Sequence, residues 1–261
     1  MLCTPALRRL FFSVVPFFLW PFPWKAQSPQ PPRASAVAPI PMEQEYHHHL
    51  VFENSYVKAF YVEIAAHDST LYHRHDLPYV SLPPPAAAGS ARSATPQGGL
   101  LPPGPEIGYT AGGFSHAVSN RSDVVLRNVA IELLHPQGVA RNRCAEAVHG
   151  EPLHDCDQPT SSDPSLPSHY TVFETDEIVV EYLALPPEGT FTSSPHSVML
   201  VGGLRGVTTS APEGVRSSGP FFDPRSGLVW LPAGSATVFK ATPGGAGHFL
   251  AIEFKDAKPV P

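Results

Sequence analysis

An internal repeat constrains the fold of this chain more than any other feature of its sequence. Four short matches share one offset of 121 residues, spread over about 80 residues of each copy. They are Val51-Phe52-Glu53 with Val172-Phe173-Glu174, Ala130-Ile131-Glu132 with Ala251-Ile252-Glu253, Gly113 with Gly234, and His75 with His196. A single register predicts two copies of one structural unit, about residues 45–135 and 168–256. The unrepeated stretch 136–167 is then a linker rich in Pro, Ser, Asp and His.

Each copy has the pattern of β-structure. Prolines number 32 in 261 residues, which excludes a fold built mostly of long helices because interior proline breaks a helix. Apolar runs rich in β-branched and aromatic residues are separated by Pro- and Gly-rich turns, which is typical of a sandwich or barrel. The runs are Tyr56–Ile64, Val124–Leu134, Glu177–Leu185 and Phe249–Phe254. We therefore predict an all-β chain, with the stretch 83–105 as a long loop in the first copy.

The first 36 residues have the pattern of an export signal. Arg8 and Arg9 precede an almost wholly apolar run, residues 10–24, and no acidic residue occurs before Glu43. Prolines interrupt this run, which is also short for a membrane span of about 20 residues. Cleavage, with Ala34-Ser35-Ala36 as one candidate site, would leave a periplasmic or secreted protein with no stable membrane span. A twin-arginine signal and an uncleaved anchor are the alternatives.

Charge excludes one class of partner. The formal net charge is −6, and removal of residues 1–36 takes away four basic residues and no acid, which gives −10. An acidic protein is not expected to bind nucleic acid or anionic lipid. The expected partner is a small molecule, and a homodimer is an open option.

Three histidines form the strongest chemical signal. His73 and His75 are separated by one residue, so they project to the same face of a strand. His116 follows a Gly112-Gly113 turn 41 residues after His75, at the start of what could be another strand. Neutral imidazoles suit Zn, Cu, Fe and Ni. These residues predict a metal site inside the first unit.

With these residues the chain resembles the cupin superfamily, over both repeat units. His73 and His75 match the His-x-His pair of the first cupin motif. Gly113, His116 and Asn120 match the second motif, and Pro232-Ala233-Gly234 matches its turn in the second unit. The resemblance implies two tandem jelly-roll barrels of the bicupin type, each able to hold a metal.

The resemblance also shows two departures. Tyr79 stands where cupins usually carry an acidic ligand, so the expected site has three histidines and no carboxylate. Tyr79 would be a hydrogen-bonding neighbour of the site or a phenolate ligand. In the second unit the 121-residue offset puts Ser194 and His196 in place of the pair and Thr237 in place of His116. We therefore expect that barrel to be free of metal.

Several functions fit such a site. Three imidazoles leave open positions on a metal, so an iron-dependent dioxygenase of a small chelating molecule is one hypothesis, with Tyr79 contacting the bound substrate or dioxygen. Iron is the preferred metal, and Mn, Ni, Cu or Zn are alternatives. Isomerisation or decarboxylation is a second enzymatic option. A non-catalytic ligand-binding or accessory module, and a barrel with buried histidines and no metal, are the non-enzymatic ones.

Two further clusters of histidine and cysteine residues allow more than one interpretation. We interpret His47-His48-His49 as a surface cluster, with incidental metal affinity as the alternative. In the linker, Cys144, His149, His154 and Cys156 lie within 13 residues, in a spacing unlike structural zinc sites. A disulfide between Cys144 and Cys156 is the preferred reading for an exported protein, with zinc binding and free thiols as alternatives.

Overall fold

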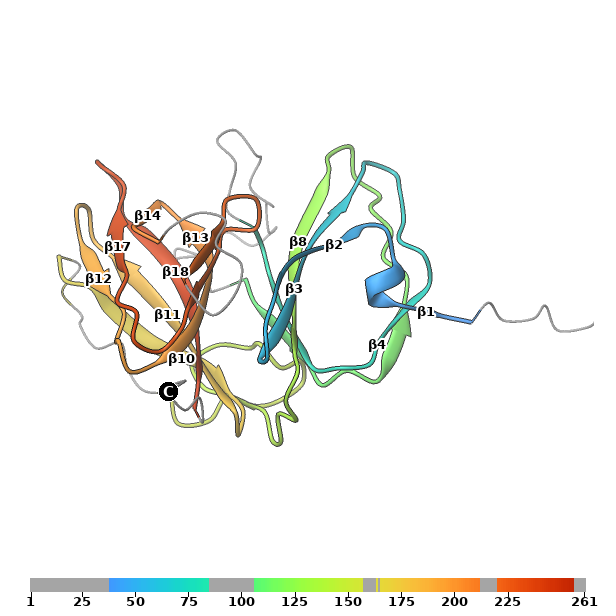
Figure 1. The fold of residues 1–261 in the computed structure, drawn as a ribbon, viewed down its shortest axis with the longest axis horizontal. Helices are drawn as coiled ribbons and strands as arrows, with labels where there is room; N and C mark the ends of the chain where they lie inside the picture. The colour runs from blue at the N-terminus through green and yellow to red at the C-terminus, as the bar shows by residue number, and fades with distance from the viewer. Residues whose placement is uncertain (1–37, 85–105, 157–162, 164, 212–219, 256–261) are drawn as a thin grey trace, which may run out of the picture. The chain divides into compact units, whose positions relative to one another are not determined.

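A computed structural model describes residues 38–84, 106–156, 163, 165–211 and 220–255. The predicted export segment 1–36 and most of the predicted loop 83–105 lie outside these residues. Within them the regular structure is β, apart from the 3-10 helix η1 (Met42–Gln44) (Figure 1). The all-β prediction is confirmed. No helix among the described residues is long and apolar enough to cross a membrane.

Two sheets form the N-terminal half. One contains five strands in the spatial order β2-β3-β8-β5-β6, and the other contains three, in the order β1-β4-β7. Their bounds are β1 (Ile40–Pro41), β2 (His48–Glu53), β3 (Val57–Ile64), β4 (His73–His75), β5 (Tyr79–Leu82), β6 (Gly108–Thr110), β7 (Phe114–His116) and β8 (Leu126–Leu133). We call this pair of sheets the first barrel.

The C-terminal half repeats the arrangement. A seven-stranded sheet has the order β15-β16-β13-β18-β11-β10-β9, and a three-stranded sheet has the order β12-β17-β14. Their bounds are β9 (Arg141–Asn142), β10 (Ser168–Glu174), β11 (Ile178–Leu185), β12 (Thr190–Thr192), β13 (Val198–Arg205), β14 (Val207–Thr209), β15 (Phe221–Asp223), β16 (Leu228–Leu231), β17 (Val238–Ala241) and β18 (Gly247–Phe254). We call this pair the second barrel.

The sequence repeat is visible in the strand pairing. Strand β3 pairs with β8 from Val57 opposite Leu133, and β11 pairs with β18 from Ile178 opposite Phe254, 121 residues further on. The two copies even share a β-bulge. It falls between Leu50 and Phe52 in β2 and at the matching place in β10. A bulge leaves one residue unpaired and reverses the facing of those beyond it.

The central strands are buried on both faces, which explains why their hydrophobic residues do not alternate cleanly with polar ones. One face of β3 and β8 packs into a core that also contains residues of the second barrel. Phe52 stacks on Phe221 at 4.8 Å between ring centroids and lies 5.5 Å from Trp230. The opposite face, with Val62, points into the first barrel. One apolar core therefore joins the two barrels.

The linker is more structured than a spacer. Strand β9 lies within the stretch 136–167 and pairs with β10. The buried side chain of Asn142 donates to the carbonyls of Val148 and Glu151 and accepts from the amides of Ala147 and Val148. The linker thus extends the large sheet of the second barrel.

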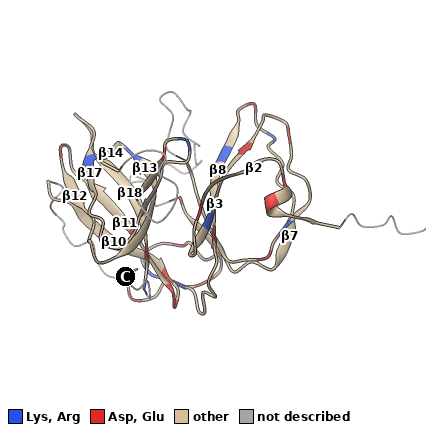
Figure 2. Ribbon diagram, viewed as in Figure 1, with Lys and Arg blue, Asp and Glu red and all other residues tan. Residues whose placement is uncertain are grey.

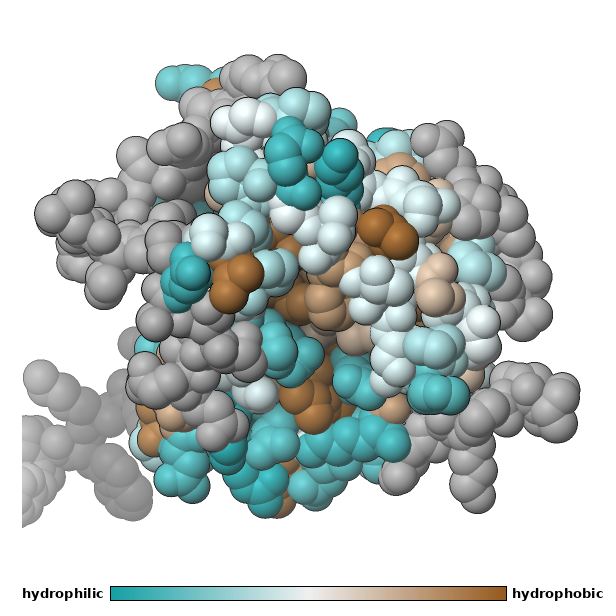
Figure 3. Space-filling model, turned by 90° about the vertical axis from the view of Figure 1, so that its left-hand side faces the viewer, coloured by the Kyte–Doolittle hydropathy of each residue, from teal (hydrophilic) through white to brown (hydrophobic). Residues whose placement is uncertain are grey.

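The described surface carries scattered charges. Figure 2 shows Lys and Arg placed singly along strands and loops, with acidic residues between them. Figure 3, which faces the second barrel, shows small groups of hydrophobic residues among polar ones. These views agree with the low share of charged residues, 15% of the sequence.

Candidate metal centre

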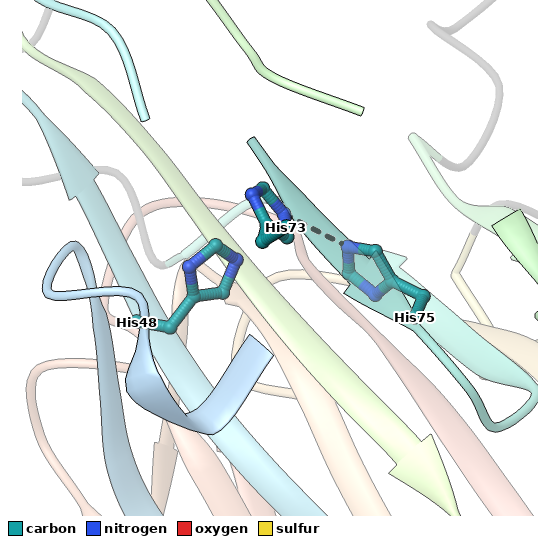
Figure 4. Close-up of side chains that lie close together, drawn as sticks. All are labelled: His48, His73 and His75. Atoms are coloured by element: carbon teal, nitrogen blue, oxygen red, sulfur yellow. Dashed lines mark hydrogen bonds between the residues drawn. The ribbon is translucent and has the colours of Figure 1, made fainter. Parts of the chain in front are cut away.

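Strand β4 presents two imidazoles to the interior of the first barrel. His73 and His75 are 0% and 2% exposed, while Arg74 between them bonds Asp76 and the carbonyl of Pro39. This is the expected result of alternation along a strand. Figure 4 shows the two rings side by side on β4.

Strand β7 supplies the third predicted histidine. It pairs antiparallel with β4, so that His116 lies directly opposite His73. The turn before β7 depends on glycine, because Gly112 and Gly113 have φ values of +80° and +76°. A Cβ at Gly112 would also collide with the carbonyl oxygen of Leu77. The two glycines thus allow the chain to bring His116 back over β4.

The three side chains converge on one point. The Nε2 atoms of His73, His75 and His116 form a nearly equilateral triangle with sides of 3.1, 3.2 and 3.1 Å. Three ligands on one face of an octahedral ion would be about 3.0 Å apart, and tetrahedral ligands about 3.4 Å, for metal–nitrogen bonds of about 2.1 Å. The observed spacing fits a metal held by three nitrogens.

The protonation state also fits a metal site. Nδ1 of His73 lies 2.8 Å from the carbonyl of Leu71 and donates to it, and Nε2 of the same ring faces the other imidazoles. Burial lowers the pKa of His75 to about 3, helped by the neighbouring histidines, and burial also lowers the pKa of His116. Neutral imidazole is the form that binds metal.

Tyr79 contacts this group through its ring. The phenol ring stacks on His75, with centroids 4.5 Å apart, and Phe114 stacks on the same imidazole at 5.2 Å. The Tyr79 hydroxyl is hydrogen-bonded to the side chain of Thr110, and burial raises the pKa of the phenol. A neutral phenol held in this way orients His75.

Sequence reasoning missed a fourth histidine. We expected residues 47–49 to form a surface cluster, but the side chains of His47 and His48 are only 5% exposed. One nitrogen from each of His48, His73 and His75 lies within 4.8 Å of the others (Figure 4). His48 matches His169 at the 121-residue offset, but His169 is 45% exposed in the second barrel, so the repeat gave no signal for a ligand here.

A buried carboxylate holds His48 and His47. Glu45 has a fully buried side chain, and it accepts hydrogen bonds from both imidazoles at 2.7 and 2.8 Å. Burial pushes the pKa of Glu45 upward, but these hydrogen bonds, with one from the Leu71 amide, outweigh that effect and lower the pKa. Burial lowers the pKa of His48 to about 4 despite the carboxylate. At neutral pH Glu45 is therefore ionised and His48 is neutral.

The second barrel has different residues at the equivalent positions. The Gly113 amide donates to the His75 carbonyl, and the Gly234 amide donates in the same way to the Pro195 carbonyl. Ser193 and Thr237, which are buried and paired through their backbones, therefore stand where His73 and His116 do. Thr237 thus replaces His116, as the 121-residue offset predicts, whereas the β12 segment is offset by 120, so Ser193 and Pro195 rather than Ser194 and His196 replace the histidine pair.

The linker cysteines are joined to each other. Cys144 and Cys156 form a disulfide with an S–S distance of 2.07 Å, as the preferred reading of the sequence has it. His149 and His154 bond instead to the neighbouring carboxylates of Glu146 and Glu151. Disulfide sulfurs are not thiolates, so the zinc alternative for this segment is wrong.

The order and pairing of the strands identify the fold. In each half a strand pair from a small sheet, β4–β7 or β12–β17, accompanies a large sheet whose central strands keep the same register. In the first half that pair carries His-x-His opposite a third histidine. The chain has the cupin fold, in two tandem barrels.

No protein-family model and no curated protein sequence matches this chain. Among solved structures it is similar to AerE from Microcystis aeruginosa, at 9% identity over 80% of this chain and 97% of that one, with a TM-score of 0.44.

Two further solved structures are similar to a comparable degree. A cupin 2 conserved barrel domain protein from Leptotrichia buccalis has 8% identity over 80% of this chain and 88% of that one, with a TM-score of 0.41. A salicylate 1,2-dioxygenase from Pseudaminobacter salicylatoxidans has 10% identity, covers 77% and 72% of the two chains, and has a TM-score of 0.42. Likeness at this level says nothing about a substrate.

Proposed function

We propose that the first barrel binds one divalent transition metal through His73, His75 and His116 and oxidises a small chelating molecule with dioxygen. Iron is the preferred metal, and Mn, Ni, Cu and Zn are the alternatives. The observation that carries the proposal is the triangle of Nε2 atoms, with sides of 3.1–3.2 Å, that the three imidazoles form inside the barrel.

The protein residues have separable roles in this proposal. The bound metal would supply Lewis acidity and electron transfer. His73 is fixed by the Leu71 carbonyl, and His75 by the rings of Tyr79 and Phe114, so neither imidazole has to reorganise on binding. Phe60, Val62 and Ile64 help to exclude water from the interior.

A non-catalytic ligand-binding module is the second candidate. Tyr79 stands where an acidic ligand was expected, and its hydroxyl is engaged with Thr110. Without a negatively charged ligand the site holds its metal less tightly, which suits a sensor or accessory protein as well as an enzyme. Metal content and oxygen consumption separate the two.

The test begins with elemental analysis of the full chain, purified without an affinity tag of histidines. We expect about one metal per chain in the wild type and in His196→Ala, which alters an exposed histidine of the second barrel. The double variant His73→Ala/His116→Ala should be empty. A folded wild type that takes up no metal after reconstitution would contradict the proposal.

Oxygen uptake then distinguishes an enzyme from a binding module. The iron-loaded protein is supplied in air with catechol, a 1,3-diketone or a small thiol. Consumption of dioxygen by the wild type and by His196→Ala, but not by the double variant, supports the oxygenase. Tight binding of one of these molecules without uptake supports the binding module.

Export is a further part of the proposal. The disulfide between Cys144 and Cys156 supports an oxidising compartment, where such bonds persist. N-terminal sequencing of the protein recovered from its host should give a start near residue 37, and alkylation without reductant should leave both cysteines unmodified. An intact N-terminus together with two free thiols would contradict export.

A further inference from the structure

Glu45 is a buried carboxylate that holds neighbouring chain segments together next to the proposed metal site. It is 1% exposed, and its carboxylate accepts four hydrogen bonds. The donors are the amide of His47 at 3.0 Å, Nδ1 of His47 at 2.8 Å, Nδ1 of His48 at 2.7 Å and the amide of Leu71 at 3.2 Å. A buried carboxylate is costly unless it is paired in this way. Its contacts join the end of η1, the start of β2 and the segment that enters β4.

The same carboxylate reaches two imidazoles of the cluster. It holds His48 directly, and it holds the backbone of Leu71, whose carbonyl accepts the Nδ1 proton of His73. A carboxylate or carbonyl that takes the distal proton of an imidazole fixes the tautomer and orientation of a metal-binding ring. Both rings therefore have the arrangement typical of ligands.

His48 has its remaining nitrogen available on the side of the cluster. Its ring centroid lies 4.8 Å from that of His73, and the ligand nitrogens of His48, His73 and His75 lie within 4.8 Å of one another. Two ligands on opposite sides of an ion would be about 4.2 Å apart for bonds of about 2.1 Å. A shift of about half an ångström brings His48 into the coordination range.

We propose that His48 is a fourth metal ligand and that Glu45 is its positioning residue. This inference rests on the proposed metal site and narrows what the site can take. Four imidazoles leave two positions on a six-coordinate ion. A bidentate molecule would fill both, so the proposed oxidation would require His48 to leave the metal when dioxygen binds beside the chelating substrate.

The test counts imidazoles rather than turnover. The full-length protein is loaded with Cu²⁺, and pulsed electron paramagnetic resonance reports the remote nitrogens of the coordinated rings. We expect four imidazoles in the wild type and three in His48→Gln. His49→Gln is the matched control, because His49 is the exposed neighbour in the same strand. Competition for Zn²⁺ should show affinity lowered about 10- to 100-fold in His48→Gln and unchanged in His49→Gln.

The positioning role of Glu45 is tested by its effect on metal binding through His48. Glu45→Gln should lower Zn²⁺ affinity by about 10-fold or more and give the copper spectrum of His48→Gln. Glu45→Asp should restore part of both. Thermal unfolding identifies variants that fold, and only these are compared. In the double variant Glu45→Gln/His48→Gln, the Glu45 change should add less than it does alone.

The outcomes separate this inference from the function on which it rests. Three imidazoles in both the wild type and His48→Gln, with equal Zn²⁺ affinities, would overturn the role of His48 and leave the three-histidine site standing. A wild type that binds neither Cu²⁺ nor Zn²⁺ would overturn the proposed function itself. If Glu45→Gln keeps four imidazoles and full affinity, the positioning role of Glu45 is wrong.

Discussion

In the first barrel the strand pair β4–β7 brings His73 and His116 together, whereas in the second the pair β12–β17 brings Ser193 and Thr237 together at that place, two residues from Phe239. Phe239 is fully buried and stacks on Phe249 at 4.8 Å, within a cluster of aliphatic side chains. The second barrel shows that this strand order is stable with an apolar interior. The imidazoles of the first barrel are therefore not needed for folding, which argues that they serve binding.

A second position shows the same contrast. Glu132 in β8 and Glu253 in β18 are repeat partners, and each lies on the inward face of its strand. Glu253 accepts a 2.5 Å hydrogen bond from the hydroxyl of Ser197. Glu132 is 3% exposed, and its Oε2 is buried without a partner. The barrel with the histidines thus also contains a buried carboxyl group with an unpaired oxygen.

The largest predicted effect comes from removing a buried aromatic side chain from the core of the second barrel. Phe239→Ala removes a fully buried ring, so it should lower the free energy of unfolding by about 3–5 kcal/mol. Metal content per folded chain should stay at the wild-type value, because the site lies in the other barrel. Urea unfolding and elemental analysis check the two statements. A folded Phe239→Ala protein without metal would break the division of roles between the barrels.

Metal removal should affect only the first barrel. At a free metal concentration of about 100 times Kd, binding stabilises the folded state by about 2.7 kcal/mol. We expect chelation to remove this increment from the wild type and from His196→Ala. The double variant His73→Ala/His116→Ala should show no change on chelation in thermal unfolding. An equal change in all three proteins would place the metal elsewhere.

The paired glutamates predict a difference in pH dependence. Burial raises the pKa of Glu132 to about 7, with a smaller contribution from the charge of Glu43. A pKa raised on folding gives stability that is present at low pH and lost as pH rises through 7. Between pH 5 and pH 8 the wild type should lose about 2 kcal/mol that Glu132→Gln retains. Glu253→Gln is the control and should follow the wild type in urea unfolding at both pH values.

The smallest expected effect concerns the phenol ring of Tyr79, which stacks on His75. Strand pairing makes Met199 the counterpart of Tyr79, since each lies opposite the glutamate of its barrel. Tyr79→Met copies the second barrel and removes an aromatic contact worth about 0.5–1.5 kcal/mol. Zinc affinity should fall by about 2- to 10-fold, while Tyr79→Phe, which keeps the ring, should bind as the wild type does. Weaker binding by Tyr79→Phe alone would assign the effect to the hydroxyl.

Much of the fold was predictable because the repeat fixes the strands that pair at one register. The apolar runs correspond to β3, β8, β11 and β18, and alternation correctly put His73 and His75 on one face. In the small sheets the repeat predicted Thr237 correctly and missed the equivalents of His73 and His75 by one position. The offset is 120 from His73 to Ser193 and 121 from His116 to Thr237, because the chain from the end of β11 to Ser193 is one residue shorter than the chain from the end of β3 to His73.

His48 was missed for a related reason. The bulge between Leu50 and Phe52 reverses the facing of residues along β2, so the buried Val51-Phe52 pair gave no guide to His48. The role of Glu45 depends on long-range contacts with Leu71, 26 residues away, that no local pattern encodes. Tertiary contacts, rather than local periodicity, complete the site.

The core that joins the two barrels limits how this protein can be rearranged. Val57, Ala59, Ile131 and Leu133 line the same cluster as Val180 and Ile252 of the other repeat. Expressed alone, the first barrel would expose this apolar face to water and invite aggregation. The first barrel is consequently not a unit that can be moved by itself into another protein. A scaffold engineered to carry this histidine site also needs an apolar surface that covers the exposed face of the first barrel.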